Sequence, residues 1–318
     1  VIPNVVSGVQ ISNGASNNTI GGVTAAAGNV ISGNGTYGVL ITGAGSTGNQ
    51  VQGNYIGTNG LGTGPVGNGS NGAAIRFGAS NNTIGGSTAT PGTGAGNVIS
   101  GNSGPGISFL DAGTTGNKIQ GNLIGTNAAG TGALGNVAFG VLLYSGASGN
   151  TIGVDGDGIN DAGERNVISG NAYGVFVQDN ANNNVIAGNY IGTNAAGTAA
   201  IPNTTEGVRI LDATVVNTRI GTNADGISDV LERNLISGNT NSNIDITGSG
   251  VVIAGNYIGT DVTGSASVGT TSNGVWLHFA ATNSRIGGTT AAARNVISGN
   301  AVNGIVLDGV GTTTNLIQ

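Results

Sequence analysis

Short segments in which apolar residues alternate with small or polar ones recur along the whole chain. They share the pattern Gly-apolar-x-apolar, as in Gly38-Val39-Leu40-Ile41, and their first residues lie 30 to 36 positions apart. Alternation with a period of two is typical of a strand with one buried face. Because each segment offers only two inward side chains, the pattern predicts strands that stack on copies of themselves. The ten segments begin at Gly8, Gly38, Gly72, Gly106, Gly140, Gly174, Gly207, Asn243, Gly274 and Gly304.

Two motifs that begin with asparagine lie between these segments and define the repeat. Asn-Val-Ile-Ser-Gly-Asn, or a close variant, alternates with Asn-(Tyr/Leu)-Ile-Gly-Thr, and each recurs after about 67 residues. The unit is therefore a turn of about 33 residues with three short strands, and two kinds of turn alternate that differ in the position of the loop. The first motif begins at Asn29, Asn97, Asn166, Asn234 and Asn295, and the second at Asn54, Asn122, Asn189 and Asn256.

Asparagine and glycine occupy the turn positions between these strands. Asparagine tolerates a left-handed backbone, and its amide can bond to an identical asparagine in the next turn. Glycine supplies a positive φ without steric cost. The Gly-Asn pairs, which occur in every turn, are therefore predicted to be structural first of all.

The repeats Asn-x-Ile-x-Gly-Asn and Gly-Val-x-Ile resemble those of right-handed parallel β-helix proteins, the pectate-lyase-like superfamily. They are most similar to the Asn/Gly-rich repeats of large bacterial secreted or cell-surface proteins. The resemblance implies an all-β fold, a single-stranded right-handed parallel β-helix of about ten turns with three short strands per turn. That superfamily includes polysaccharide lyases and hydrolases, phage tailspikes, adhesins and passive stalks, so function has to be argued from the site.

The repeat pattern covers residues 1–318, which predicts one solenoid domain. Both chain ends fall inside turns, and neither shows a polar cap that would shield a terminal strand. We therefore expect a piece of a longer array or a subunit that associates end to end.

Composition narrows the class of protein further. Of 318 residues, 64 are Gly, and each would cost about 1 kcal/mol inside a helix, so helices are expected to be minor. The net charge is −6 and Lys118 is the only lysine, which argues against nucleic acid as a partner. No apolar run reaches the roughly 18 residues of a membrane span. The absence of cysteine fits an extracellular or cell-surface location.

Seven of the 14 acidic residues lie in two loops, 153–164 and 221–232, that share one pattern. The pattern resembles the twelve-residue calcium loop of EF-hands, in which spaced carboxylates and a final Glu surround Ca²⁺. It departs at the opening position, where Gly153 and Gly221 replace Asp; the alternative is a polar loop with surface charges. The predicted Ca²⁺ ligands are Asp155, Asp157, Asp161 and Glu164 in the first loop, and Asn223, Asp225, Asp229 and Glu232 in the second.

The outward side of the third strand is the other candidate site. Asp179 and Asp212 hold equivalent positions in adjacent turns, about 5 Å apart along the axis, and Arg209 lies on the strand that leads to Asp212. A carboxylate pair could serve glycoside hydrolysis, and carboxylates with arginine could serve a lyase. The alternative is that both are ordinary turn residues. His278, the only histidine, could line a sugar-stacking patch with Trp276, or the pair could be incidental.

An apolar row on the second strand remains to be explained. Each of its residues precedes an inward Ile and should point outward by alternation. Either the Ala/Thr/Gly-rich loops fold over this row, or it is a lateral contact between molecules. The row consists of Val30, Tyr55, Val98, Leu123, Val167, Tyr190, Leu235, Tyr257 and Val296.

These observations leave two hypotheses for function. The first is a non-catalytic extracellular β-helix, a surface stalk, adhesin or filament-forming module that associates with itself end to end or laterally. The second is a carbohydrate-active β-helix, namely a polysaccharide-binding module, lyase or hydrolase that uses the outer face of the third strand. Stacking explains almost every residue, which favours the first hypothesis.

Overall fold

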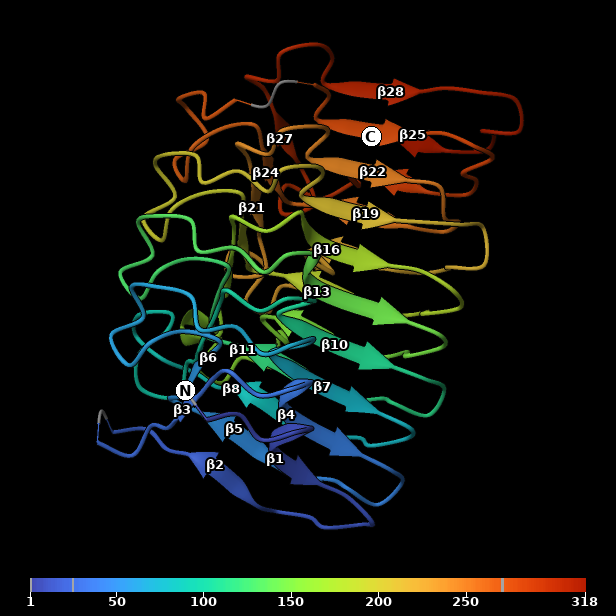
Figure 1. Ribbon diagram of the computed structural model, residues 1–318. Coiled ribbons are helices and arrows are strands. Elements are labelled where there is room, and N and C mark those ends of the chain that lie inside the picture. Colours follow the sequence, from blue (N-terminus) through green and yellow to red (C-terminus); the bar gives the residue numbers. More distant parts are fainter. Residues whose placement is uncertain (1, 25, 270–271) are drawn as a thin grey trace.

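The chain winds into a parallel β-helix in which each turn adds one strand to each of three sheets. The computed structural model describes residues 2–24, 26–269 and 272–318. Figure 1 shows the turns stacked from the N-terminal one, in blue, to the C-terminal one, in red. In this part of the chain, sheets A and B have ten strands each and sheet C has nine, all paired in parallel. The all-β parallel β-helix with three strands per turn is therefore confirmed.

The strands are short, as the sequence pattern predicts. Sheet A consists of β1 (Ser7–Ile11), β4 (Tyr37–Thr42), β7 (Ala73–Arg76), β10 (Ile107–Leu110), β13 (Phe139–Tyr144), β16 (Tyr173–Val177), β19 (Val208–Ile210), β22 (Ile244–Ile246), β25 (Val275–Leu277) and β28 (Ile305–Leu307). Sheet B consists of β2 (Thr19–Gly21), β5 (Gln50–Gln52), β8 (Thr83–Gly85), β11 (Lys118–Gln120), β14 (Thr151–Gly153), β17 (Val185–Ala187), β20 (Arg219–Gly221), β23 (Val252–Ala254), β26 (Arg285–Ile286) and β29 (Leu316–Ile317). Sheet C consists of β3 (Val30–Ile31), β6 (Tyr55–Ile56), β9 (Val98–Ile99), β12 (Leu123–Ile124), β15 (Val167–Ile168), β18 (Tyr190–Ile191), β21 (Leu235–Ile236), β24 (Tyr257–Ile258) and β27 (Val296–Ile297).

The core consists of columns of inward side chains, in which each residue lies beside the residue at the same strand position of the next turn. In sheet A, Ile107 lies beside Val141 and Phe109 beside Leu143, and all four are fully buried. Stacking of identical turns therefore buries side chains that a single turn would leave exposed to solvent.

Helices are nearly absent from the fold. Within the described ranges, the one helix is a 3₁₀ turn, Asp161–Gly163. None of the described helices has the length and hydropathy of a membrane span.

Three asparagine ladders hold the turns together at the corners between sheets. In one of them, Asn54 donates through Nδ2 to Asn97 Oδ1 at 3.0 Å, and Asn97 donates to Asn122 Oδ1 at 2.8 Å. The backbone N–H of most of these asparagines donates to the same oxygen, as from Asn97 to Asn122 at 3.0 Å. The side chains of Asn97 and Asn122 are fully buried. The predicted bond between identical asparagines in successive turns is confirmed.

Loops cover most of the outward row of sheet C, which we call the second-strand row. Its middle members Val98, Leu123, Val167 and Leu235 are at most 2% exposed and pack into a second apolar cluster. Loop residues pack against this cluster, namely Ala128, Ala195 and Val262. Of the two explanations that the sequence leaves open, loop cover is therefore the one that the structure shows for the middle of the row.

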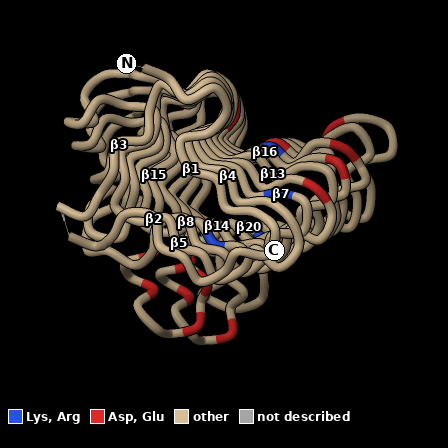
Figure 2. The backbone as a smooth tube through the Cα atoms, turned by 60° about the horizontal axis from the view of Figure 1, so that its bottom comes forward, with Lys and Arg blue, Asp and Glu red and all other residues tan. Residues whose placement is uncertain are grey.

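Charged residues are confined to a few places on this scaffold. Figure 2 shows acidic residues in the loops that project below β14 and β20 in that view and in turns at the right, whereas most of the tube is uncharged. The projecting loops include 153–164 and 221–232, which follow β14 and β20 directly. The acidic residues therefore gather in these loops and along sheet A.

Candidate functional site

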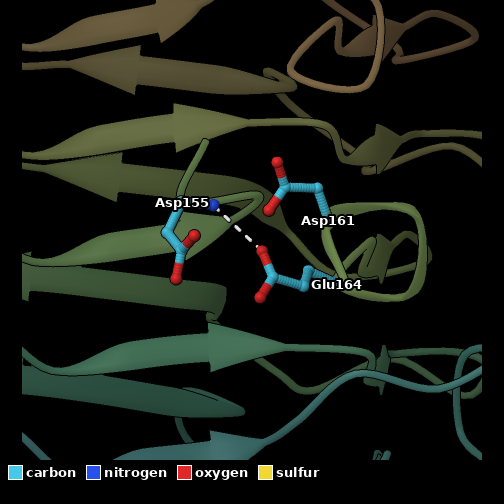
Figure 3. Close-up of side chains that lie close together, drawn as sticks. All are labelled: Asp155, Asp161 and Glu164. Atoms are coloured by element: carbon cyan, nitrogen blue, oxygen red, sulfur yellow. Dashed lines mark hydrogen bonds between the residues drawn. The ribbon is translucent and has the colours of Figure 1, made fainter. Parts of the chain in front are cut away.

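The first acidic loop brings three of its carboxylates together. Asp155, Asp161 and Glu164 each place an oxygen within 4.8 Å of the other two, and Figure 3 shows the three side chains around one point. Asp155 N–H donates to Glu164 Oε2 at 3.0 Å, which closes the loop. Asp157 lies outside this group and is exposed. The sequence thus predicts three ligands that the structure clusters and one that it does not.

The opening glycine of each loop has a structural cause. Gly153 and Gly221 have φ values of +93° and +97°, and a Cβ at either would lie 1.9 Å from a carbonyl oxygen of the next turn, that of Ala187 or Ala254. No Asp can stand at that position without displacing the backbone of the adjacent turn. The missing first carboxylate of the calcium-loop pattern is therefore a consequence of stacking.

The second loop repeats two backbone-to-carboxylate hydrogen bonds of the first. Asn223 N–H donates to Glu232 Oε2 at 3.0 Å, as Asp155 N–H donates to Glu164. Gly226 N–H donates to Asp229 Oδ2 at 3.2 Å, as Gly158 N–H donates to Asp161 at 3.1 Å. The two loops therefore share these bonds, although only the first contains a 3₁₀ turn, Asp161–Gly163.

Side chains complete the second loop and leave the first one open. Thr222 donates its hydroxyl to Asp229 Oδ1 at 2.8 Å, and Arg219 donates to Glu232 Oε1 at 2.8 Å. In the first loop Val154 replaces Thr222, and Asp161 Oδ1 is buried without a hydrogen-bond partner in the part of the chain that the structure describes. A carboxylate oxygen that is buried, lacks a hydrogen-bond partner and lies beside two other carboxylates is suited to ligate a hard divalent cation.

Burial and nearby charges in the first acidic loop determine how it would bind a cation. Burial raises the pKa of Glu164 to about 7, and the charges of Asp155 and Asp161 add to this increase. Lys118 bonds to Asp155 Oδ2 and is the one cation that pairs with this cluster in the described part of the chain. A divalent ion would therefore displace a proton from Glu164 and share Asp155 with Lys118.

A second polar cluster lies on the outward face of sheet A. Arg209 on β19 donates to Asp245 Oδ2 at 2.6 Å, and the other oxygen of Asp245, on β22, lies 2.8 Å from His278 Nε2. The Glu206 carboxylate approaches Arg209 to 3.7 Å, and Trp276 stacks on the His278 ring with centroids 4.0 Å apart. We call these five residues the sheet A cluster. Asp245 and His278 are 1% and 4% exposed, although they point away from the core.

Three polar atoms of the sheet A cluster have no hydrogen-bond partner among the described residues. They are Glu206 Oε2, Trp276 Nε1 and His278 Nδ1, and all three are buried. An ionised carboxylate only accepts, so in its neutral form the His278 ring donates from Nε2 to Asp245 and presents an acceptor at Nδ1. Burial raises the pKa of Glu206, against the lowering effect of Arg209. The cluster therefore presents unsatisfied acceptors and a donor side by side.

Aromatic rings continue the face toward the N-terminal turns. Phe176 lies beside Arg209 in the sheet register, and its ring centroid is 4.6 Å from that of Phe139 and 5.1 Å from that of Tyr173. Phe176 and Trp276 are three strand spacings apart, about 14 Å. The charged residues of the face thus lie between two aromatic groups.

The predicted pair Asp179 and Asp212 lies beside this cluster and serves turns. Both residues have left-handed φ values, 55° and 75°. Asp212 Oδ2 accepts from the backbone N–H of Asp179 at 3.1 Å, and Oδ1 accepts from Thr214 N–H at 2.9 Å. Arg209 bonds to Asp245 instead of to either of them. The sequence reasoning did not single out Asp245 and Glu206; the register of Arg209, Asp245 and Trp276 was the signal that could have found Asp245.

Comparison with known proteins gives similarities of architecture only. No family model and no curated protein matches the chain. The A-module of mannuronan C-5 epimerase AlgE6 from Azotobacter vinelandii is 16% identical with a TM-score of 0.39, over 89% of this chain and 82% of that one. An alginate lyase from Paenibacillus sp. strain FPU-7 is 16% identical with a TM-score of 0.34, over 95% of this chain and 98% of that one.

Proposed function

We propose that this β-helix binds a polysaccharide along the outer face of sheet A, with the sheet A cluster as the contact site. The observation that carries the proposal is the set of three buried, unpartnered polar atoms in one cluster. Leaving such an atom unsatisfied costs about 1–3 kcal/mol, so the cluster is poorly explained by stability alone. Sugar hydroxyl groups both donate and accept hydrogen bonds. They can therefore pair with the unsatisfied acceptors of Glu206 and His278 and with the unsatisfied donor of Trp276.

The aromatic rings support the same proposal. Sugar rings present apolar C–H faces, which pack on aromatic side chains. Access to His278 requires the Phe279 ring to move, since that ring packs at 4.4 Å on the imidazole. Phe279 is 73% exposed and has a left-handed φ of 48°, so the solvated ring lies in a strained turn. We propose that the Phe279 side chain moves aside when the polysaccharide binds.

We thus favour the carbohydrate-active hypothesis over that of a passive stalk. The proposal includes an extracellular or cell-surface location, where polysaccharides occur. Self-association, end to end or lateral, stays a prediction.

Affinity electrophoresis on a panel of neutral and acidic polysaccharides tests the proposal. Arg209→Gln should abolish retardation by the polysaccharide that binds the unmodified protein. Arg76→Gln is the matched control, because Arg76 also pairs with an aspartate of the same face, Asp111 at 3.2 Å, four strands away. Equal retardation of both variants, or no retardation of the unmodified protein by any member of the panel, would refute the proposal. Reducing-sugar and unsaturated-uronate assays on the same panel then separate a binding module from a hydrolase or lyase.

We further propose that the first acidic loop binds Ca²⁺ through Asp155, Asp161 and Glu164. The observation that favours this second function is the unpartnered Asp161 Oδ1. Calcium should raise the temperature of thermal unfolding, and Asp161→Asn should remove most of that rise. Asp229→Asn, at the same position of the second loop, is the control and should leave the calcium effect intact. Calcium would then hold the beginning of the projecting loop, at Asp155, to its end, at Asp161 and Glu164.

A further inference from the structure

Two arginines beside the second-strand row have no acidic partner. Arg165 and Arg233 hold the same position in alternate turns, two residues before β15 and β21. In the described residues, no Asp or Glu oxygen lies within 4.0 Å of either guanidinium. Arg165 Nε is buried without an acceptor, whereas Arg233 Nε donates to the Gly255 carbonyl at 2.8 Å. Both charges are thus uncompensated, in a protein whose net charge is negative.

Each guanidinium is held by a tyrosine ring of the next turn. Arg165 lies 4.2 Å from the ring centroid of Tyr190, and Arg233 lies 4.2 Å from that of Tyr257. Stacking on a ring positions the guanidinium plane and leaves its terminal N–H groups free to donate. Strands β15, β18 and β21 are neighbours in sheet C, so the two arginines are two strand spacings apart, about 10 Å.

A pocket opens between these two stacked pairs. It has a volume of about 170 Å³ and is lined by both arginines and both tyrosines. Apolar side chains supply the rest of the lining, and no carboxylate takes part: Val230, Leu231, Leu235 and Val262. The volume is below the roughly 300–1,000 Å³ of sites for drug-sized molecules, which restricts the occupant to a small molecule or to one residue of a chain.

We propose that this pocket binds a small organic anion, whose carboxylate accepts hydrogen bonds from the guanidinium groups at its rim and whose carbon skeleton packs on the tyrosine and aliphatic walls. Guanidinium is the side-chain group whose donors match a carboxylate in geometry. The site is separate from the sheet A cluster and does not depend on it. The carboxylate can be carried by a sugar acid or by an aromatic acid.

Isothermal titration calorimetry with D-glucuronate and with benzoate tests the proposal, and D-glucose serves as the uncharged sugar. At least one carboxylate should bind and glucose should not; the tighter of the two identifies the source of the carboxylate. Arg165→Gln and Arg233→Gln should each weaken binding by about tenfold or more. Arg294→Gln is the matched control, because Arg294 holds the same repeat position two turns later but is exposed and outside the pocket.

Two results would overturn the proposal. One is that neither carboxylate binds; the other is that Arg294→Gln weakens binding as much as the pocket variants, which would indicate a general charge effect. Val230→Asp guards against loss of folding, because Val230 is 70% exposed yet lines the pocket. Its added carboxylate should repel the ligand and abolish binding without disturbing the core, and undiminished binding by this variant would also contradict the site.

Discussion

At the scale of single residues, the buried asparagines supply acceptors for backbone N–H groups that the turns themselves leave unpaired. Asn117 Oδ1 accepts from both the backbone N–H and the side chain of Asn82, at 3.0 and 3.1 Å. Its own amide donates to Asn150 Oδ1 at 3.0 Å. Since these residues are fully buried, water cannot replace any bond that is lost.

Replacing Asn117 by Ala should therefore destabilise the protein. The substitution leaves the backbone N–H of Asn82 without an acceptor, at a cost of about 1–3 kcal/mol. Urea unfolding followed by circular dichroism measures the change. Asn303→Ala is the control, because the exposed Asn303 side chain makes one surface bond, to Asn273; equal stability of the two variants would argue against the ladder's role.

The buried Glu164 predicts a pH dependence of stability in the absence of metal. Its folded pKa, raised to about 7 from 4.5, means that the folded state binds more protons than the unfolded state between these values. The stability it contributes is fully present below pH about 4.5 and is lost as pH rises through about 7. Thermal unfolding with a chelator, at pH 5 and pH 8, should show a larger decrease for the unmodified protein than for Glu164→Gln. A similar decrease in both would place the titration elsewhere.

At the scale of elements, the two acidic loops are an internal comparison. Backbone N–H groups make matching hydrogen bonds to Glu164 and Asp161 in the first loop and to Glu232 and Asp229 in the second. A valine-to-threonine difference accompanies the satisfied state of Asp229. Thr222 supplies a hydroxyl to Asp229, while Val154 supplies none to Asp161. The strand position also differs, since Arg219 replaces Thr151 and bonds to Glu232.

Val154→Thr should convert the first loop to the state of the second. The new hydroxyl would donate to Asp161 Oδ1, so the stabilisation by Ca²⁺ should fall, while stability without calcium should rise by about 1 kcal/mol. Calcium titrations followed by differential scanning calorimetry measure both quantities. Thr222→Val, the reverse change in the second loop, should lower stability without calcium. A Val154→Thr protein with an unchanged calcium response would contradict the assigned ligand.

Sequence reasoning succeeds where the interaction is repeated and fails where it is unique. The inward columns and the asparagine ladders recur in many turns, so a single sequence displays them many times, as at Asn97 and Asn122. The bond from Arg209 to Asp245 occurs once, between residues that are 36 positions apart. The strand register can place these two residues side by side, but no repeated pattern singles out their bond. The same holds for the contact of Thr222 with Asp229, which depends on how the loop folds back. The matching backbones of the two loops were visible as a shared pattern, but the difference in their side-chain contacts was not.

At the scale of the whole molecule, stability should be distributed along the axis. Sheet hydrogen bonds join each turn to its neighbours, and loop contacts reach one turn further, as from Thr88 N–H to the Gly163 carbonyl at 2.8 Å. The free energy of unfolding is therefore approximately a sum over turns and the contacts between nearby turns. Core residues of middle turns, such as Ile119 and Ile186, are 0% exposed, whereas Ile20 is 9% and Ile317 is 50% exposed. Turns near either end of this 318-residue chain have less packed surface to lose.

Hydrogen exchange measured by mass spectrometry should follow this gradient. Amides of β11, β14 and β17 should exchange most slowly, and those of β2 and β29 most quickly, because local opening of an outer turn disrupts one interface. Exchange at one uniform rate in all turns would mean that the solenoid opens only as a whole.

The ladders also give the molecule a direction. In the run from Asn29 through Asn54 to Asn97, the side-chain N–H donates toward the following turn and the side-chain oxygen accepts from the preceding one. A cut between any two turns of such a run therefore exposes amide hydrogens on one surface and amide oxygens on the other. Two copies can extend the ladders only by joining unlike surfaces, a heterologous contact that repeats without closing.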